Sequence, residues 1–98
     1  MKTLVFSEKS RDDLLSILRY IARDKPHAAA RFVDKLEQQC EFLARFPESG
    51  TKRDDLATAL RLFTFRGYGV YFRNLDDRVR IERVLPPGLD ILQQSFGD

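Results

Sequence analysis

Residues 60–85 read LRLFTFRGYGVYFRNLDDRVRIERVL, and this stretch decides the fold class. Apolar side chains recur at every second position in parts of it, as in Tyr68, Val70 and Phe72. Such alternation predicts half-buried strands. Residues 66–67 and 74–77 are rich in turn-forming types, so consecutive strands should pair as antiparallel hairpins. The strands are predicted at Leu60–Phe65, Tyr68–Arg73 and Val79–Leu85. Pro86, Pro87 and Gly88 end the last one, because proline cannot donate to a ladder.

Two amphipathic helices are predicted upstream of this stretch. After a short strand at residues 3–6, Ser7 is suited to cap the first helix. The apolar stripe of that helix is Leu14, Ile17, Leu18 and Ile21. Pro26 fits the first position of the second helix. The second stripe is Ala29, Phe32, Val33, Leu36, Cys40 and Leu43, and Pro47 ends the helix.

The short connection between the two helices predicts an antiparallel helical hairpin. The element order is then β-αα-βββ. We expect an α+β fold in which the helical hairpin packs on one face of an antiparallel sheet. The chain has 98 residues and no linker-like segment, so residues 1–98 are expected to form a single domain.

Composition excludes several classes of protein. Cys40 is the only cysteine, which rules out an internal disulfide and a zinc site built on thiolates. A reducing compartment suits such a chain. The apolar run at residues 3–6 is too short for a signal peptide core, and no run reaches the length of a membrane span. We therefore expect a soluble, cytoplasmic protein without membrane association.

The positive charge is concentrated in residues 61–83. That segment holds six arginines and no lysine against Asp76, Asp77 and Glu82. Arginine suits bidentate contact with carboxylates or phosphates. The block is either a solvated sheet face or a surface for an acidic protein partner, and nucleic acid is a weaker option.

The usual signals of catalysis are missing. Gly67 and Gly69 lack the rest of a phosphate-binding loop. Cys40 lies on an apolar helical stripe, which favours a buried core thiol, and His27 is expected to be exposed. The adjacent pairs Asp12/Asp13 and Asp54/Asp55 are interpreted as first-turn and loop charges. No metal site or cofactor is predicted.

The whole chain resembles the ParE/RelE superfamily, and within it a ParE-like toxin of a type II toxin–antitoxin system. The order and spacing of the matches over most of the chain carry the resemblance, rather than any one of them. The matching residues are Ser7, Asp13-Leu14, Ile17, Tyr20-Ile21, Ala28-Ala29, Phe32, Leu43, Phe46-Pro47, Gly50, Arg61, Gly67-Tyr68, Tyr71-Phe72-Arg73, Val79, Ile81, Arg83-Val84-Leu85 and Asp90.

The resemblance implies a protein that acts by binding and is not an enzyme. ParE-like members inhibit DNA gyrase and arrest growth, and a ParD-like antitoxin neutralises them, in some cases as a toxin–antitoxin heterotetramer. Sequence-specific nucleic-acid binding is not expected. The antitoxin should dock in an apolar groove between the helical hairpin and the sheet. Candidate partner-binding residues are Arg61, Arg73, Arg83, Tyr71 and Asp90.

Two other functions stay open. RelE-like members cut mRNA on the ribosome, which requires a general acid and base. Here Pro86-Pro87-Gly88-Leu89 follows the last strand and has no titratable side chain, which disfavours a nuclease. The ParE pattern commonly has His at position 86 and Arg at position 89, so a non-toxic chain that still binds an antitoxin is the second alternative. A structural role for Arg61 and Arg83 is also open, each pairing with a carboxylate such as Glu82 or Asp90.

Overall fold

The computed structural model describes residues 1–97, and it confirms the predicted order of helices and main strands. A two-residue strand after the second helix and a single 3-10 turn near the end were not predicted. The elements are β1 (Thr3–Phe6), α1 (Glu8–Ala22), α2 (Pro26–Arg45), β2 (Thr51–Lys52), β3 (Leu60–Phe65), β4 (Tyr68–Asn74), β5 (Arg78–Leu85) and η1 (Ile91–Gln93).

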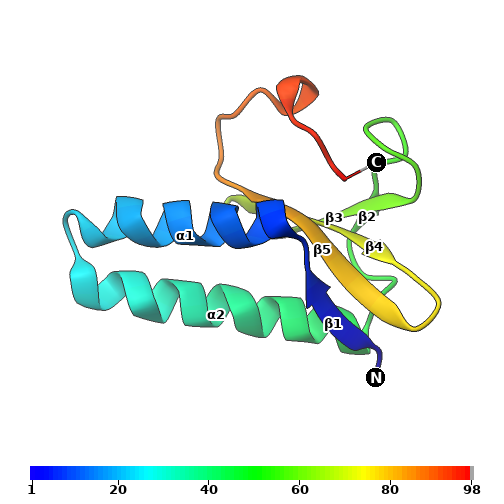
Figure 1. Cartoon of the computed structure of the whole chain (residues 1–98), viewed down its shortest axis with the longest axis horizontal. Helices are drawn as coiled ribbons and strands as arrows, with labels where there is room; N and C mark the ends of the chain where they lie inside the picture. The colour runs from blue at the N-terminus through cyan, green and yellow to red at the C-terminus, as the bar shows by residue number, and fades with distance from the viewer. Residues whose placement is uncertain (98) are drawn as a thin grey trace.

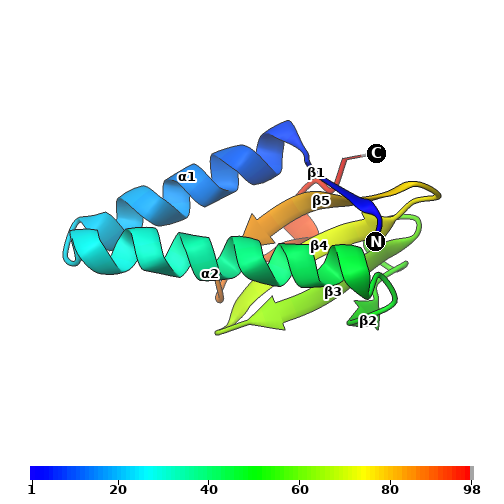
Figure 2. The same ribbon diagram turned by 90° about the horizontal axis from the view of Figure 1, so that it is seen from below.

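The α+β arrangement, with a helical hairpin on one face of the sheet, is confirmed (Figures 1 and 2). The strand order is β1-β5-β4-β3-β2. The three predicted hairpin strands pair antiparallel, as expected. The sheet as a whole is mixed, because β1 lies against the outer edge of β5 and runs parallel to it.

The helices begin and end where the sequence places them. Ser7 caps α1, since its Oγ accepts a hydrogen bond from the Ser10 N–H at 3.0 Å. Pro26 occupies the first turn of α2. The two apolar stripes meet the sheet with Ile17, Leu36 and Leu43 buried among its strands. This packing holds α1 and α2 against β4 and β5.

Cys40 belongs to the same core, as predicted. Its side chain is fully buried and is a free thiol. Burial, followed by the negative charges of Glu37 and Glu41, raises the pKa of the Cys40 thiol to about 12. The thiol is therefore neutral at physiological pH.

A bulge in β5 sets which side chains face the helices. Tyr71 pairs with Arg83, whereas the next residue, Phe72, pairs with Ile81, so Glu82 is an extra residue in β5. The bulge shifts the alternation by one position. As a result, both Ile81 and Val84 join the helix-facing core.

The opposite face of the sheet has a second, smaller core. Leu60, Tyr71 and Leu85 provide its sheet side chains, and Phe96 covers them. The ring centroids of Tyr71 and Phe96 lie 4.8 Å apart. Residues 90–97, which we call the C-terminal tail, therefore fold back over the face that the helices leave open (Figure 1).

Candidate partner-binding site

An open groove lies between α1 and the end of β5, and it has a volume of about 650 Å³. Its apolar wall consists of Ile17, Tyr20, Tyr68, Val84, Leu85, Pro86, Pro87 and Leu89. Tyr20 is 70% exposed and Leu89 is 41% exposed. Large apolar side chains that remain open to solvent around a concave surface are typical of a binding site. We call this surface the apolar groove.

An ion pair between Asp13 and Arg83 lies in the wall of the apolar groove. The Asp13 carboxylate accepts hydrogen bonds from Arg83 Nε at 2.8 Å and from Arg83 Nη2 at 3.0 Å. It also accepts one from the backbone N–H of Val84 at 2.9 Å. The hydrogen bond to Asp13 raises the pKa of the Arg83 guanidinium, so Arg83 remains a cation. The pair joins α1 to β5.

Arg83 also holds the C-terminal tail. Its Nη1 donates to the backbone carbonyl of Ser95 at 3.0 Å. Sequence interpretation had offered Glu82 or Asp90 as the carboxylate for Arg83, and this is wrong. Glu82 pairs with Arg73 and Arg80 instead, and the carboxylate that pairs with Arg83 is Asp13, 70 positions away in sequence.

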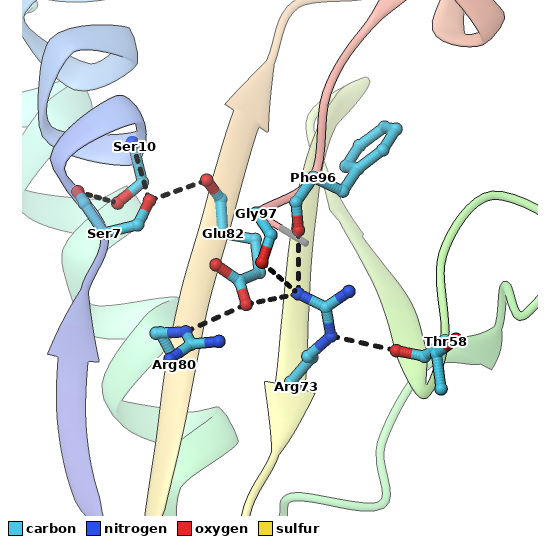
Figure 3. A network of polar contacts seen from close by, with 8 residues as sticks. All are labelled: Ser7, Ser10, Thr58, Arg73, Arg80, Glu82, Phe96 and Gly97. Atoms are coloured by element: carbon cyan, nitrogen blue, oxygen red, sulfur yellow. Dashed lines mark hydrogen bonds and ion pairs between the residues drawn. The ribbon is translucent and has the colours of Figure 1, made fainter.

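A buried polar network lies beneath the C-terminal tail (Figure 3). Glu82 is 2% exposed, and its Oε2 accepts hydrogen bonds from Arg73 Nη1 at 2.6 Å and from Arg80 Nε at 2.9 Å. Arg73 also donates to the carbonyls of Thr58 at 2.9 Å and of Phe96 at 2.7 Å. Arg73 thus connects β4, the segment before β3 and the tail.

Three further residues predicted to bind a partner have structural contacts. Tyr71 is buried against Phe96, and burial raises the pKa of its hydroxyl. Arg61 donates to the backbone carbonyls of Ser49, at 3.2 Å, and of Glu48, so the alternative carboxylate partner proposed for it is also wrong. The Asp90 side chain accepts from the Leu92 N–H at 3.2 Å and begins η1.

These positions divide the candidate residues into two groups. Arg83 lines the apolar groove, where a partner can reach it. Arg73 and Tyr71 are almost fully covered, and Arg61 and Asp90 lie apart from the groove lining. Sequence reasoning missed Asp13 as a site residue, since it was interpreted as a first-turn charge. The one signal that separates it from its neighbour Asp12 is its place among the residues that match the superfamily.

The described residues 1–97 contain no cluster of three His, Cys, Asp or Glu side chains that is suited to hold a metal ion. His27 is exposed at the start of α2, as predicted. Within the same residues, neither helix is long and apolar enough to cross a membrane. The arrangement offers surfaces for binding and one thiol that is closed to solvent.

Comparisons with known proteins agree with this fold. Residues 4–87 match the family model described as "ParE toxin of type II toxin-antitoxin system, parDE". Among solved structures, the chain is similar to one from the "Chromosomal ParDE TA system from P. aeruginosa". The TM-score is 0.77 at 21% identity, and the match covers 89% of this chain and 97% of the other. No curated protein sequence matches significantly.

Proposed function

The chain belongs to the ParE toxin family of type II toxin–antitoxin systems, and from this we propose that it inhibits DNA gyrase by binding and is neutralised by a ParD-like antitoxin. It acts in the cytoplasm, where its target works on DNA. The observation that carries the proposal is the apolar groove, an open surface with exposed apolar side chains. Such a surface suits a toxin of a toxin–antitoxin family, which must bind partners.

Binding, rather than catalysis, is supported by the state of the ionisable groups. A nuclease needs a base that is free to take the proton of the 2′-hydroxyl. In the apolar groove, the Asp13 carboxylate already accepts three hydrogen bonds, and Arg83 is held as a cation. Tyr71 is buried with a raised pKa. We propose that none of these groups acts as a general base.

The apolar groove suits an amphipathic helix or an extended segment of the antitoxin. Such partners insert apolar side chains at regular spacing into a groove. Tyr20 lines the groove and is 70% exposed, and tyrosine is enriched among the residues that contribute most to binding free energy once a partner covers them. Arg83 in the wall is paired with Asp13, so the two charges cancel and apolar contact is the main attraction that the groove offers. A toxin–antitoxin heterotetramer follows from the family by analogy.

The experiment for this proposal is to induce the chain alone in bacteria and to follow DNA and protein synthesis with labelled precursors. We expect DNA synthesis to fall first, and co-expression of the cognate ParD-like antitoxin to restore growth. A fall in protein synthesis before DNA synthesis would instead support an mRNA endonuclease. Variants Arg61→Ala and Arg83→Ala would then be tested for loss of RNA cleavage with folding retained.

The segment Pro86–Leu89 motivates one alternative, a chain that binds an antitoxin without poisoning gyrase. This segment lines the apolar groove, and it lacks the His and Arg that relatives commonly have at positions 86 and 89. If the departure has removed toxicity, the double variant Pro86→His, Leu89→Arg gains toxicity when induced alone. Equal growth arrest by the original chain and the variant contradicts this alternative.

A further inference from the structure

A second hollow, of about 480 Å³, is lined by residues of α1, α2 and the β3–β4 turn. Its apolar lining is Ile21, Ala28 and Phe32, and its polar lining consists of three cations, Arg31, Lys35 and Arg66. Among residues 1–97, no acidic side chain lines it. We call this surface, formed by these six residues, the cationic hollow.

No carboxylate of residues 1–97 neutralises the three cations of the cationic hollow. Within residues 1–97, Arg31, Lys35 and Arg66 form no ion pair and donate no side-chain hydrogen bond. The arginines of the sheet differ, since Arg73, Arg80 and Arg83 are each bound to a carboxylate. Like charges around one hollow repel one another, and an anionic ligand would relieve that repulsion.

Arg66 is held in position by an unusual backbone. Its φ is 51°, a left-handed conformation that residues other than glycine rarely adopt. Its guanidinium lies 5.0 Å from the centre of the Phe65 ring, in cation–π geometry. Glycine or asparagine would fit such a turn with less strain. Arg66 nevertheless occupies this turn, and the Phe65 ring holds its guanidinium beside the hollow.

The cationic hollow is next to the apolar groove. Tyr68 lines the groove, and its ring centroid is 4.9 Å from that of Phe32, which lines the hollow. A bound segment with apolar side chains in the groove would therefore extend its next residues over the hollow. Carboxylates at that position would meet Arg31, Lys35 and Arg66.

We propose that the cationic hollow binds the carboxylate side chains of an acidic, amphipathic segment of a protein partner. Half of its lining is apolar, which suits a segment that mixes Glu or Asp with apolar residues. Nucleic acid is disfavoured, because duplex binding relies on many phosphate contacts along an extended basic surface. The inference rests on the proposed function in one respect, that the antitoxin is the expected source of the segment.

The test measures binding of a fluorescein-labelled model peptide of Glu and Leu at helical spacing to the full chain by fluorescence anisotropy. The variant Arg31→Gln, Lys35→Gln is expected to weaken binding by about tenfold, and added salt to weaken binding by the original chain more than by the variant. The control is Arg11→Gln, an exposed α1 cation outside both hollows, which should bind within about twofold of the original chain. Circular dichroism confirms that each variant is folded.

Three outcomes would overturn the inference. The first is that the double variant binds the peptide as tightly as the original chain does, and the second is that a peptide with Lys in place of Glu binds equally well. The third is that a short DNA duplex binds more tightly than the peptide, with the same dependence on Arg31 and Lys35. Failure of the proposed function is a separate result. If induction of the chain alone causes no growth arrest while the peptide still binds through Arg31 and Lys35, the proposed toxin activity fails and the inference stands. If the antitoxin neutralises the chain but the affinity of the model peptide does not depend on Arg31 and Lys35, the inference fails and the toxin activity stands.

Discussion

Arginines at different positions of this chain have different physical roles, and their partners decide which. Arg73 and Arg83 hold elements together through Glu82 and Asp13, and both also donate to carbonyls of the C-terminal tail. Arg31 and Arg66 line a hollow that contains no carboxylate. A count of arginines along the sequence does not separate the two kinds, whereas the contacts do.

Glu82 is the residue on which the buried network depends. Glu82→Ala would leave Arg73 and Arg80 without their shared carboxylate, so we expect the free energy of unfolding to fall by about 3 kcal/mol. Urea denaturation measures the change. In a double-mutant cycle with Arg73→Met, the two losses should add to more than the loss in the double variant. Strict additivity would show that the two side chains do not stabilise each other.

Cys40 should make alkaline stability depend on pH. The folded thiol has a pKa of about 12 against an ordinary value of 9.0, so the unfolded chain releases this proton first as pH rises. Its contribution to stability is complete below pH 9 and is lost between about pH 9 and 12. Urea midpoints measured from pH 8 to 11 should fall more steeply for the original chain than for Cys40→Ala. Parallel curves would contradict this account, as would rapid reaction of the folded thiol with a disulfide reagent at pH 8.

At the scale of elements, the C-terminal tail covers the face of the sheet that the helices leave open. Phe96 is 5% exposed against Tyr71, whereas Leu92 in the same tail is 80% exposed. We expect Phe96→Ala to lower the free energy of unfolding by about 3 kcal/mol. The matched change Leu92→Ala should alter it by less than about 0.5 kcal/mol. Thermal unfolding of the two variants side by side tests this, and equal effects would mean that the tail does not pack as described.

The apolar groove between α1 and β5 gives a second prediction at this scale. Tyr20→Ala removes an exposed side chain of the groove lining and should weaken binding of the cognate antitoxin by at least about tenfold, with little loss of stability. Leu15→Ala is the control, because Leu15 is an exposed residue of α1 outside the groove lining. Calorimetric titration with the antitoxin measures the affinity of each variant. Equal affinities for the two variants would place the antitoxin elsewhere.

Periodic elements were predictable from the sequence, and contacts between distant residues were not. The apolar stripe that contains Leu36, Cys40 and Leu43 indicates which face of the helix is buried, because a helix repeats every 3.6 residues. The bulge at Glu82 breaks a two-residue period that looks regular in sequence. The partnership of Asp13 with Arg83 joins positions 70 apart, and local pattern carries no information about it. For this reason, the resemblance identified the family while the positions of most candidate site residues came only from the structure.

At the scale of the whole molecule, we propose a protein that acts by binding. Two layers bury one core between helices and sheet, and the C-terminal tail buries a second core on the other face. The apolar groove remains open, with the cationic hollow beside it. The chain belongs to the ParE toxin family, and its central arginines are engaged in ion pairs. On these grounds we propose that it holds partners rather than transforms a substrate.

The most direct test is supercoiling of relaxed plasmid by purified DNA gyrase with increasing amounts of this chain, followed by addition of the cognate antitoxin. We predict that supercoiling is inhibited, that cleaved plasmid accumulates, and that the antitoxin reverses both effects. Tyr20→Ala is assayed in parallel for both inhibition of supercoiling and reversal by the antitoxin. Glu82→Ala is not a suitable control, because it is expected to be destabilised. Undiminished supercoiling at a large excess of folded chain, together with cleavage of mRNA on ribosomes, would contradict the account.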